Sequence, residues 1–418
     1  MLALLVLAYN LQMTETASNG RPSIPGFEPR SPDFHQNPLP IYKAMRDSAP
    51  ACWHPGENYW VLSRFDDVRK ALFDWETFSN QGGVVIGEGS FFKPFLLIMD
   101  PPYHTRLRQL MVDILTPKRF RELEPAIRKR TRVLLAPGLA TGSLDLAADV
   151  AARLPMAIIG RLLGVPEAMD EQLIAWGHAI GNIEHGSAED GRRAVDSIQK
   201  IYAYYDRVFD ERLAEAPRDD VIGRIVQLEQ SGELDRDEAI GFGFLITIAG
   251  SETTTRLIGN LAVLLERHPQ AKGELLEDHT LVTGAIEEAL RFDSPTYLET
   301  RTLARDLELH GQILREGEQV ALLFNAANHD ERQFEEPERF DIHRTLKVTD
   351  HLAFGGGVHA CIGVQLARLE ARILFEELFS LAPDYTLDLA SARHTHSTNQ
   401  RGWRSLPLTC TPREIDHG

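Results

Sequence analysis

Apolar side chains recur every three to four residues over most of the chain beyond residue 104. Residues with this spacing share one face of a helix, which can then pack against a core. The pattern predicts helices at residues 121–135, 195–213, 222–228, 238–267, 280–292 and 364–381. We therefore expect a mainly α protein.

Shorter runs rich in β-branched and aromatic residues predict a small β region. They lie at residues 59–63, 319–324, 383–389 and 406–410. Residues 1–30 predict an extended or disordered arm, because Pro, Gly and Ser are frequent in its second half. No similar linker divides the rest, so we expect one domain at residues 31–418, although the length would allow two or three.

The composition narrows the classes of function. A net charge of −17 opposes binding to nucleic acid and to anionic membranes. Cys52, Cys361 and Cys410 are too few and too scattered for a disulfide framework, which indicates a reducing, cytoplasmic setting. The apolar residues 1–8 are too short to span a bilayer, and we favour an extension ahead of a natural start at Met13 over a signal peptide or an anchor.

A glycine-rich loop ends in a cysteine directly before a predicted helix, in the run FGGGVHACIG at residues 354–363. Consecutive glycines permit positive φ angles and close backbone approach. The amides and the dipole at a helix start can stabilise a thiolate at Cys361. A lone thiolate suits one axial position on a metal, whereas zinc needs three or four ligands nearby. The alternative is a glycine turn with a buried structural cysteine.

A second segment, IAGSETTT at residues 248–255, lies inside the longest predicted helix. The small residues Ala249 and Gly250 let a ligand approach the helix backbone. Glu252 and Thr253 place a carboxylate and a hydroxyl beside that opening, and such a pair can relay protons. Alternatively, the threonine hydroxyls bond back to the preceding turn and have only a structural role.

A third segment, EALR, places Glu288 and Arg291 three residues apart on one helix face, where they can form a buried bidentate ion pair. This spacing is common and indicates little by itself. In order and spacing, however, the three segments together resemble the signature motifs of the cytochrome P450 family. DPPYHTRLR at residues 100–108 is also similar to the bacterial motif DPPxHxRxR. The resemblance covers nearly the whole chain after the arm.

The resemblance implies the cytochrome P450 fold, mainly α with a small β region. Haem b (iron protoporphyrin IX) would lie between the central I helix and the L helix that follows Cys361, the iron ligand. Glu252 and Thr253 would deliver protons to oxygen, although many bacterial members carry Asp where this chain has Glu252. The other residues implied at the haem are His104, Arg108, Arg301 and His359 for the propionates, with Phe354, Gly355, Ala249 and Gly250.

Glu288 and Arg291 match the ExxR pair of the family. The resemblance implies a third member of this salt-bridge network. Arg339, in the run PERF at residues 337–340, is our expectation, and Arg344 is the second choice.

The implied reaction inserts one atom of O2 into a hydrophobic small organic substrate. Electrons would come from NAD(P)H through a separate ferredoxin and ferredoxin reductase. We expect a monomer, with a basic docking face for the ferredoxin that includes Arg119, Arg368 and Arg372. A peroxide-driven haem enzyme and a haem-based sensor or carrier are the alternatives, but neither would need the Glu252–Thr253 pair.

The substrate itself leaves fewer signals. The residues expected at the pocket are Phe91, Phe92, Phe95, Phe244, Ile248, Tyr297, Leu298 and Thr398. Filling of the core is an equally good interpretation for each phenylalanine. The expectation is therefore an apolar, aromatic pocket and nothing finer.

Overall fold

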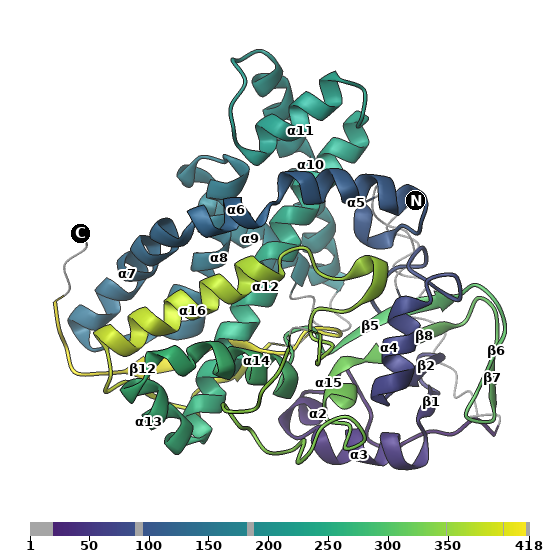
Figure 1. Cartoon of the computed structure of the whole chain (residues 1–418). Coiled ribbons are helices and arrows are strands. Elements are labelled where there is room, and N and C mark those ends of the chain that lie inside the picture. Colours follow the sequence, from purple (N-terminus) through teal and green to yellow (C-terminus); the bar gives the residue numbers. More distant parts are fainter. Residues whose placement is uncertain (1–19, 88–94, 182–187, 348, 396, 415–418) are drawn as a thin grey trace.

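Helices form most of the protein and pack around a long central helix, α12 (Arg236–Arg267) (Figure 1). The computed structural model describes residues 20–87, 95–181, 188–347, 349–395 and 397–414. The other α-helices are α2 (Pro32–Gln36), α3 (Leu39–Ser48), α4 (Phe65–Phe73), α5 (Tyr103–Ile114), α6 (Pro117–Glu122), α7 (Glu124–Thr141), α8 (Arg153–Leu163), α9 (Asp170–Gly181), α10 (Ala188–Leu213), α11 (Val221–Gln230), α13 (Pro269–Glu277), α14 (Val282–Phe292), α15 (Phe324–Asn328) and α16 (Val364–Leu381).

The β region is small and lies mostly to one side of the helices (Figure 1). Its strands are β1 (Ala51–His54), β2 (Tyr59–Leu62), β3 (Phe78–Ser79), β4 (Ser143–Asp145), β5 (Leu298–Leu303), β6 (Leu307–Leu309), β7 (Gln312–Leu314), β8 (Gln319–Leu323), β9 (Thr386–Leu387), β10 (Arg393–His394), β11 (Trp403–Ser405) and β12 (Pro407–Thr409). The main sheet has the order β1-β2-β8-β5-β3, and only its β2–β8 pair is parallel.

The central helix α12 is buried on nearly every side, because α8, α9, α10, α14 and α16 all pack against it. A capping box starts it: Asp235 accepts a hydrogen bond from the amide of Glu238, and the Glu238 carboxylate accepts one from the amide of Asp235. Pro269 follows its last turn and cannot continue it. Between Glu238 and Leu265, the residues that are not buried are 248–250 and Thr253.

Most predicted elements are confirmed. The helix predicted at residues 364–381 has those bounds in α16, and the one at 238–267 is α12 with two residues added at its start. The prediction at residues 383–389 is wrong for most of its length, since only Thr386–Leu387 pairs as a strand. The strand predicted at residues 319–324 ends one residue early, because Phe324 begins α15.

Residues 20–30, part of the arm expected to be extended or disordered, pack onto the main sheet. Phe27 is buried in a cluster beneath the sheet, and the amide of Trp53 donates to the carbonyl of Pro22 at 2.7 Å. The Arg21 guanidinium lies 4.0 Å from the centre of the Trp53 ring. These contacts order residues 20–30 although Pro, Gly and Ser are frequent there. Residues 1–19, with the start proposed at Met13, lie outside the described residues.

Within the described part of the chain, no helix combines the length and the apolar character that crossing a bilayer requires.

Candidate functional site

A cavity of about 430 Å³ lies beside the middle of α12. Its wall combines segments that are far apart in the chain: α5, α9, α12, β5, the loop before α16 and the turn at residues 397–400. The predicted residues that line it are Cys361, Glu252, Thr253, His104, Arg108, Arg301, His359, Phe354, Gly355, Ala249, Gly250, Phe95, Phe244, Ile248 and Thr398. The fold therefore places the cysteine loop, the IAGSETTT segment and the propionate candidates around one space, whereas Glu288 and Arg291 do not line it.

The loop before α16 is a closed turn that rests on α4. The amide of Cys361 donates to the carbonyl of Phe354 at 3.0 Å. Gly355 and Gly357 have φ angles of +66° and +63°, which a side chain would strain. A Cβ at residue 357 would also lie 2.3 Å from the carbonyl oxygen of Leu72. Gly357 thus lets the loop pack closely against α4. Gly355 lines the cavity instead, and a Cβ there would meet no atom within 4 Å.

The Cys361 side chain is exposed to the cavity that it lines. The cavity itself is surrounded by protein, so the thiol is buried within the molecule. Burial raises the pKa of its thiol, while the Gly363 amide and the charge of Arg108 act in the opposite direction. The net direction is upward, because burial outweighs these two stabilising contacts. A metal cation bound to the sulfur would supply the missing stabilisation.

An ion-pair cluster holds the ring of Phe354 in the cavity wall. The Arg368 guanidinium lies 4.6 Å from the centre of this ring. Arg368 Nη2 also binds Glu287 Oε2 at 2.7 Å, and His351 Nε2 lies 3.3 Å from the same oxygen. Burial raises the pKa of Glu287, but these two basic neighbours outweigh it and lower the pKa to about 2. The carboxylate stays ionised and keeps Arg368 against Phe354.

Four basic side chains share another part of the wall. The ring centres of His104 and His359 are 4.2 Å apart, and the charges of Arg108 and Arg301 act on His359. Burial and then the charge of Arg108 lower the pKa of His104 to about 4. Burial and the three basic neighbours lower the pKa of His359 to about 3. Both ring nitrogens of His104 and Nε2 of His359 are buried with no hydrogen-bond partner among the described residues.

This cluster fits the two propionates of a haem. A buried nitrogen without a partner costs about 1–3 kcal/mol, and like charges close together add to that cost. Arg301 has a partner in Glu299 at 3.2 Å, but that one carboxylate does not reach the histidine nitrogens. Two further carboxylates would accept hydrogen bonds from these nitrogens and offset the charges. With a thiol in the same cavity, the residues present match a haem held through its iron and its propionates.

Thr253 faces the cavity from the middle of α12. Its hydroxyl donates to the carbonyl of Ala249 at 3.1 Å, which is the bonding expected of a structural threonine. Thr247, Ser251 and Thr255 make the same bond to the preceding turn. Thr253 differs because it lies in the cavity wall, where its oxygen can still accept a hydrogen bond.

Glu252 is held by two residues that the sequence analysis missed. Arg256 Nη2 lies 2.8 Å from Glu252 Oε2, and His178 Nδ1 lies 3.2 Å from Glu252 Oε1. The i,i+4 spacing of Glu252 and Arg256 is a signal that could have predicted their pairing. His178 lies on α9, and nothing in the sequence links it to Glu252.

The ExxR pair is confirmed, but Arg339 was the wrong third member. Arg291 binds both oxygens of Glu288 at 2.8 Å, and neither side chain is exposed. Arg344 Nε completes the network at 3.2 Å from Glu288 Oε2. The Arg339 side chain points outward and pairs with Glu336, because its turn directs the backbone carbonyl of Arg339 toward Arg291 instead.

Two pocket predictions are wrong. Tyr297 and Leu298 are fully buried in the core cluster beneath the main sheet, on the side away from the cavity. Alternate residues of an extended strand point to opposite faces, so Glu299 and Arg301 line the cavity and Leu298 does not. Phe91 and Phe92 lie outside the described residues, so their predicted role is untested.

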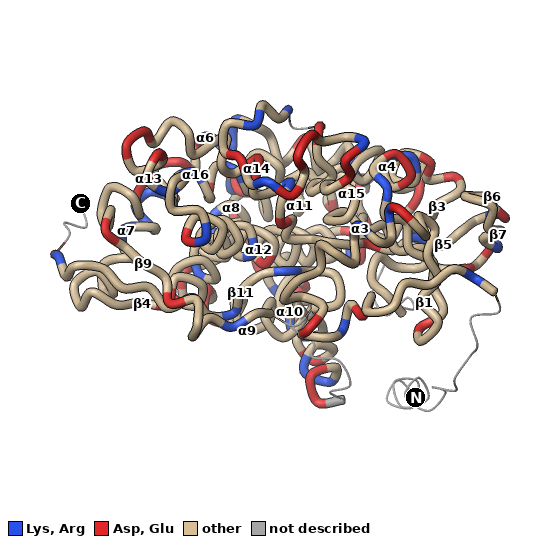
Figure 2. Tube along the Cα trace, turned by 90° about the horizontal axis from the view of Figure 1, so that it is seen from below, with Lys and Arg blue, Asp and Glu red and all other residues tan. Residues whose placement is uncertain are grey.

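The expected basic docking face is not a patch of unpaired cations in the described structure. Arg119 binds Asp219 at 2.5 Å, and Arg372 binds Glu376 at 2.6 Å. Arg368 is occupied by Glu287, as described above. Figure 2 shows basic and acidic residues interspersed along the chain trace. A partner of either sign would therefore have to compete with existing ion pairs there.

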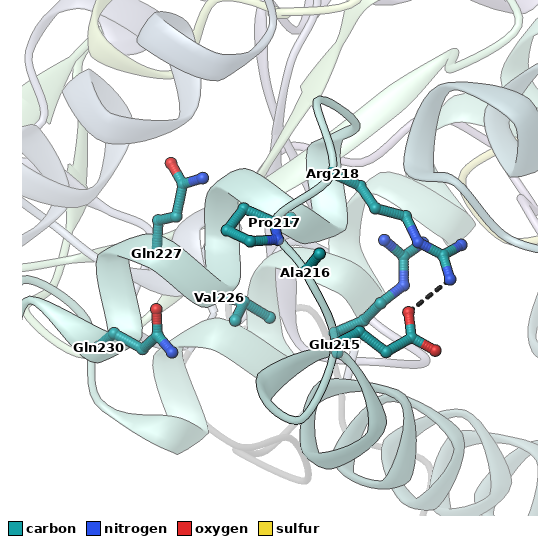
Figure 3. A pocket seen from close by; sticks show the side chains of 9 residues that line it. Glu215, Ala216, Pro217, Arg218, Val226, Gln227 and Gln230 are labelled. Atoms are coloured by element: carbon teal, nitrogen blue, oxygen red, sulfur yellow. Dashed lines mark hydrogen bonds and ion pairs between the residues drawn. The ribbon is translucent and has the colours of Figure 1, made fainter.

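A second, much smaller hollow of about 30 Å³ lies between the end of α10 and α11 (Figure 3). Glu215 and Arg218 at its edge pair with each other. It contains no predicted site residue, so the cavity beside α12 is the candidate site.

Comparison with known proteins points to one family. A family profile described as "Cytochrome P450" matches residues 183–381. The chain is 35% identical to the vitamin D(3) 25-hydroxylase of Pseudonocardia autotrophica over 394 residues, which cover 91% of this chain and 95% of the relative. It resembles the structure of cytochrome P450 CYP109Q5 from Chondromyces apiculatus with a TM-score of 0.83 and 32% identity, covering 93% and 98% of the two chains. It also resembles CYP109E1 from Bacillus megaterium in complex with corticosterone, with a TM-score of 0.81, 31% identity and coverage of 91% and 100%.

Proposed function

The chain belongs to the cytochrome P450 family of haem monooxygenases, and from this premise we propose that residues 31–418 form a single catalytic domain that oxidises a hydrophobic small organic molecule. The observation that carries the proposal is one cavity that contains both a thiol, Cys361, and the cluster of His104, Arg108, Arg301 and His359. The first suits an iron and the second suits propionates.

Residues from several walls of the cavity would bind the haem. Cys361 would bind the iron, and the four basic side chains would bind the propionates. Phe354 and Gly355 would lie against one face of the macrocycle, and Ala249 and Gly250 would leave room on the other. When bound, the haem supplies the activation of O2, for which protein side chains have no suitable chemistry.

The residues of α12 would control protons in this space. The Thr253 oxygen can accept a hydrogen bond at the cavity wall, and Glu252, the preceding residue, also lines the cavity. Together they would deliver protons to the part of the cavity beside Thr253, so that bulk water need not enter the cavity to supply them.

An apolar substrate fits the rest of the wall. Phe95 and Phe244 meet edge to face with ring centres 5.9 Å apart, and Ile248 lies beside them in the lining. One relative is a vitamin D(3) 25-hydroxylase and one similar structure is a complex with corticosterone, and both molecules are largely apolar. For electrons, we propose NAD(P)H with a separate ferredoxin and its reductase, as the resemblance to bacterial members of the family implies.

Absorption spectroscopy of the haem-loaded protein tests the proposal. We expect the reduced protein with carbon monoxide to show the red-shifted band of a thiolate-bound haem, and Cys361→Ser to lose it while Cys410→Ser keeps it. Binding of a hydrophobic compound should shift the haem band of the oxidised protein, which provides a screen for the substrate. A thiolate band that survives in Cys361→Ser would refute the assignment.

A further inference from the structure

Glu252 lies between the cavity and the protein surface. Glu252 is one of the residues that line the cavity, and its side chain is only 9% exposed. On the other side of the carboxylate, His178 Nδ1 lies 3.2 Å from Oε1, and the His178 side chain is 41% exposed. One short contact therefore connects solvent to a buried acid of the cavity.

Two features keep the carboxylate in this position. Arg256 Nη2 binds Oε2 at 2.8 Å, and the Arg256 side chain is 2% exposed. Gly181, on α9, lies over the stem of Glu252, since a Cβ there would come within 3.2 Å of Glu252 Cγ. The absence of a side chain at residue 181 thus makes room for Glu252, while Arg256 fixes one of its oxygens and leaves the other to His178.

We infer that His178 is the surface end of a proton path that enters the cavity through Glu252, with Arg256 as the residue that positions Glu252. This inference rests on the proposed function. Protonated His178 gives its Nδ1 proton to Glu252, and the neutral carboxyl gives a proton to an acceptor in the cavity beside Thr253. Glu252 returns to the carboxylate, and His178 takes a new proton from solvent. No other bond is made or broken.

The charged groups around Glu252 suit this exchange. His178 faces it from α9, Arg256 faces it from the next turn of α12, and Thr395 of the C-terminal segment binds Arg256 rather than Glu252. Burial lowers the pKa of Arg256, and the charge of Glu252 acts in the opposite direction. An arginine remains charged and does not release its proton at neutral pH, whereas a histidine gains and loses one there. His178 is therefore the partner that can pass a proton on.

Oxygen uptake by the holoenzyme tests the path, with O2 as the probe, NADPH as the electron source and a plant ferredoxin and its reductase as surrogate partners. We compare wild type with His178→Ala, His178→Arg and Glu252→Gln. We expect His178→Ala to slow uptake by at least about 10-fold, within the range of proton-transfer catalysis. His178→Arg should be equally slow although it keeps a positive charge. Adding His178→Ala to Glu252→Gln should cause no further loss.

The matched control is His343→Gln, which removes a histidine from another surface pair, His343 Nε2 with Glu274 Oε2 at 2.5 Å. It should behave as wild type. A second readout, urea unfolding of the holoenzyme, checks the contact: the losses of stability in His178→Ala and Glu252→Gln should not add in the double variant.

Three results would overturn the path: His178→Ala as fast as His343→Gln, full activity in His178→Arg, or additive losses of stability. The failure of the proposed function would look different, because wild-type holoenzyme would then add nothing to the oxygen uptake of NADPH, ferredoxin and reductase alone.

Discussion

The hydroxyl of Thr253 is the smallest group on which the proposed function depends. Because its partner, the Ala249 carbonyl, belongs to the same helix and keeps the amide of residue 253 as a donor, Thr253→Ala should leave the fold and the haem content unchanged. We expect it to lower product formation by about 100-fold, the lower end of the usual contribution of proton delivery, while hydrogen peroxide accounts for most of the O2 consumed. Measurement of product, peroxide and O2 in the same reaction checks this.

Thr253→Ser is the control, because it retains the hydroxyl and should restore most of the product. Unchanged coupling of O2 to product in Thr253→Ala would remove the role that we give to Thr253.

Glu370 is a buried acid that the proposed function does not use. It lies on α16, its side chain is fully buried, and neither carboxyl oxygen has a hydrogen-bond partner within the described residues. Burial raises its pKa well above the ordinary value of 4.5. Since the unfolded chain loses this proton first, the contribution of Glu370 to stability is complete below about pH 4.5 and is lost as the pH rises toward the pKa of the folded state.

We therefore expect Glu370→Met to stabilise the protein by about 1–3 kcal/mol at pH 7, the usual cost of a buried polar group without a partner. The gain should shrink as the pH falls toward 5, by at most about 1.4 kcal/mol per pH unit. Urea unfolding at both pH values measures it. Glu377→Met on the same helix is the control: Glu377 is equally buried but binds Arg128 and Arg132 at 2.6 Å, so its loss should destabilise. A loss of stability in Glu370→Met would mean that its carboxyl has a partner in solution.

At the scale of elements, the periodicity of apolar residues predicted the long helices correctly. It failed for short strands, whose extent and direction depend on tertiary contacts. The bounds of α16 are those predicted, since its apolar face faces the core throughout. The strand expected at residues 383–389 has only two paired residues, because its partner β12 offers a short edge. Leu298 and Tyr297 were expected at the pocket, but the direction of a side chain in β5 depends on the register with β8, which composition does not contain.

The salt-bridge network around Glu288 shows the same limit and provides a test. A motif places an arginine in the chain, but only the turn at residues 336–344 decides that Arg344 reaches Glu288. We expect Arg344→Ala to lower the free energy of unfolding by about 2–3 kcal/mol, because it removes one ion pair of a fully buried carboxylate. Arg339→Ala should change it by less than about 0.5 kcal/mol, since Arg339 is 61% exposed. Equal losses in the two variants, measured by urea unfolding, would show that Arg339 also supports the network.

On the scale of the whole molecule, the cavity is assembled from residues that the chain separates widely. Cys361, Thr253 and His104 belong to α16's preceding loop, α12 and α5, and only the packing of these elements brings them together. Resemblance to a family predicted this assembly, while the residues alone left each motif with a structural alternative. Contacts particular to this chain, such as His178 with Glu252, had no such guide.

The same assembly implies that the protein without haem is strained at the propionate cluster. His104 is fully buried, and its two ring nitrogens have no hydrogen-bond partner in the described part of the chain. His104→Leu should therefore stabilise the haem-free protein by about 1–3 kcal/mol, because a buried polar group without a partner is replaced by an apolar one. In the haem-loaded protein the same change removes a propionate partner, so it should weaken haem binding and lower the stability. Thermal unfolding of both forms measures the two effects, with His343→Leu, at a surface pair with Glu274, as the control. A gain of stability without haem and a loss with haem would show that His104 binds the propionates. A loss of stability in both forms would show that His104 is an ordinary core histidine.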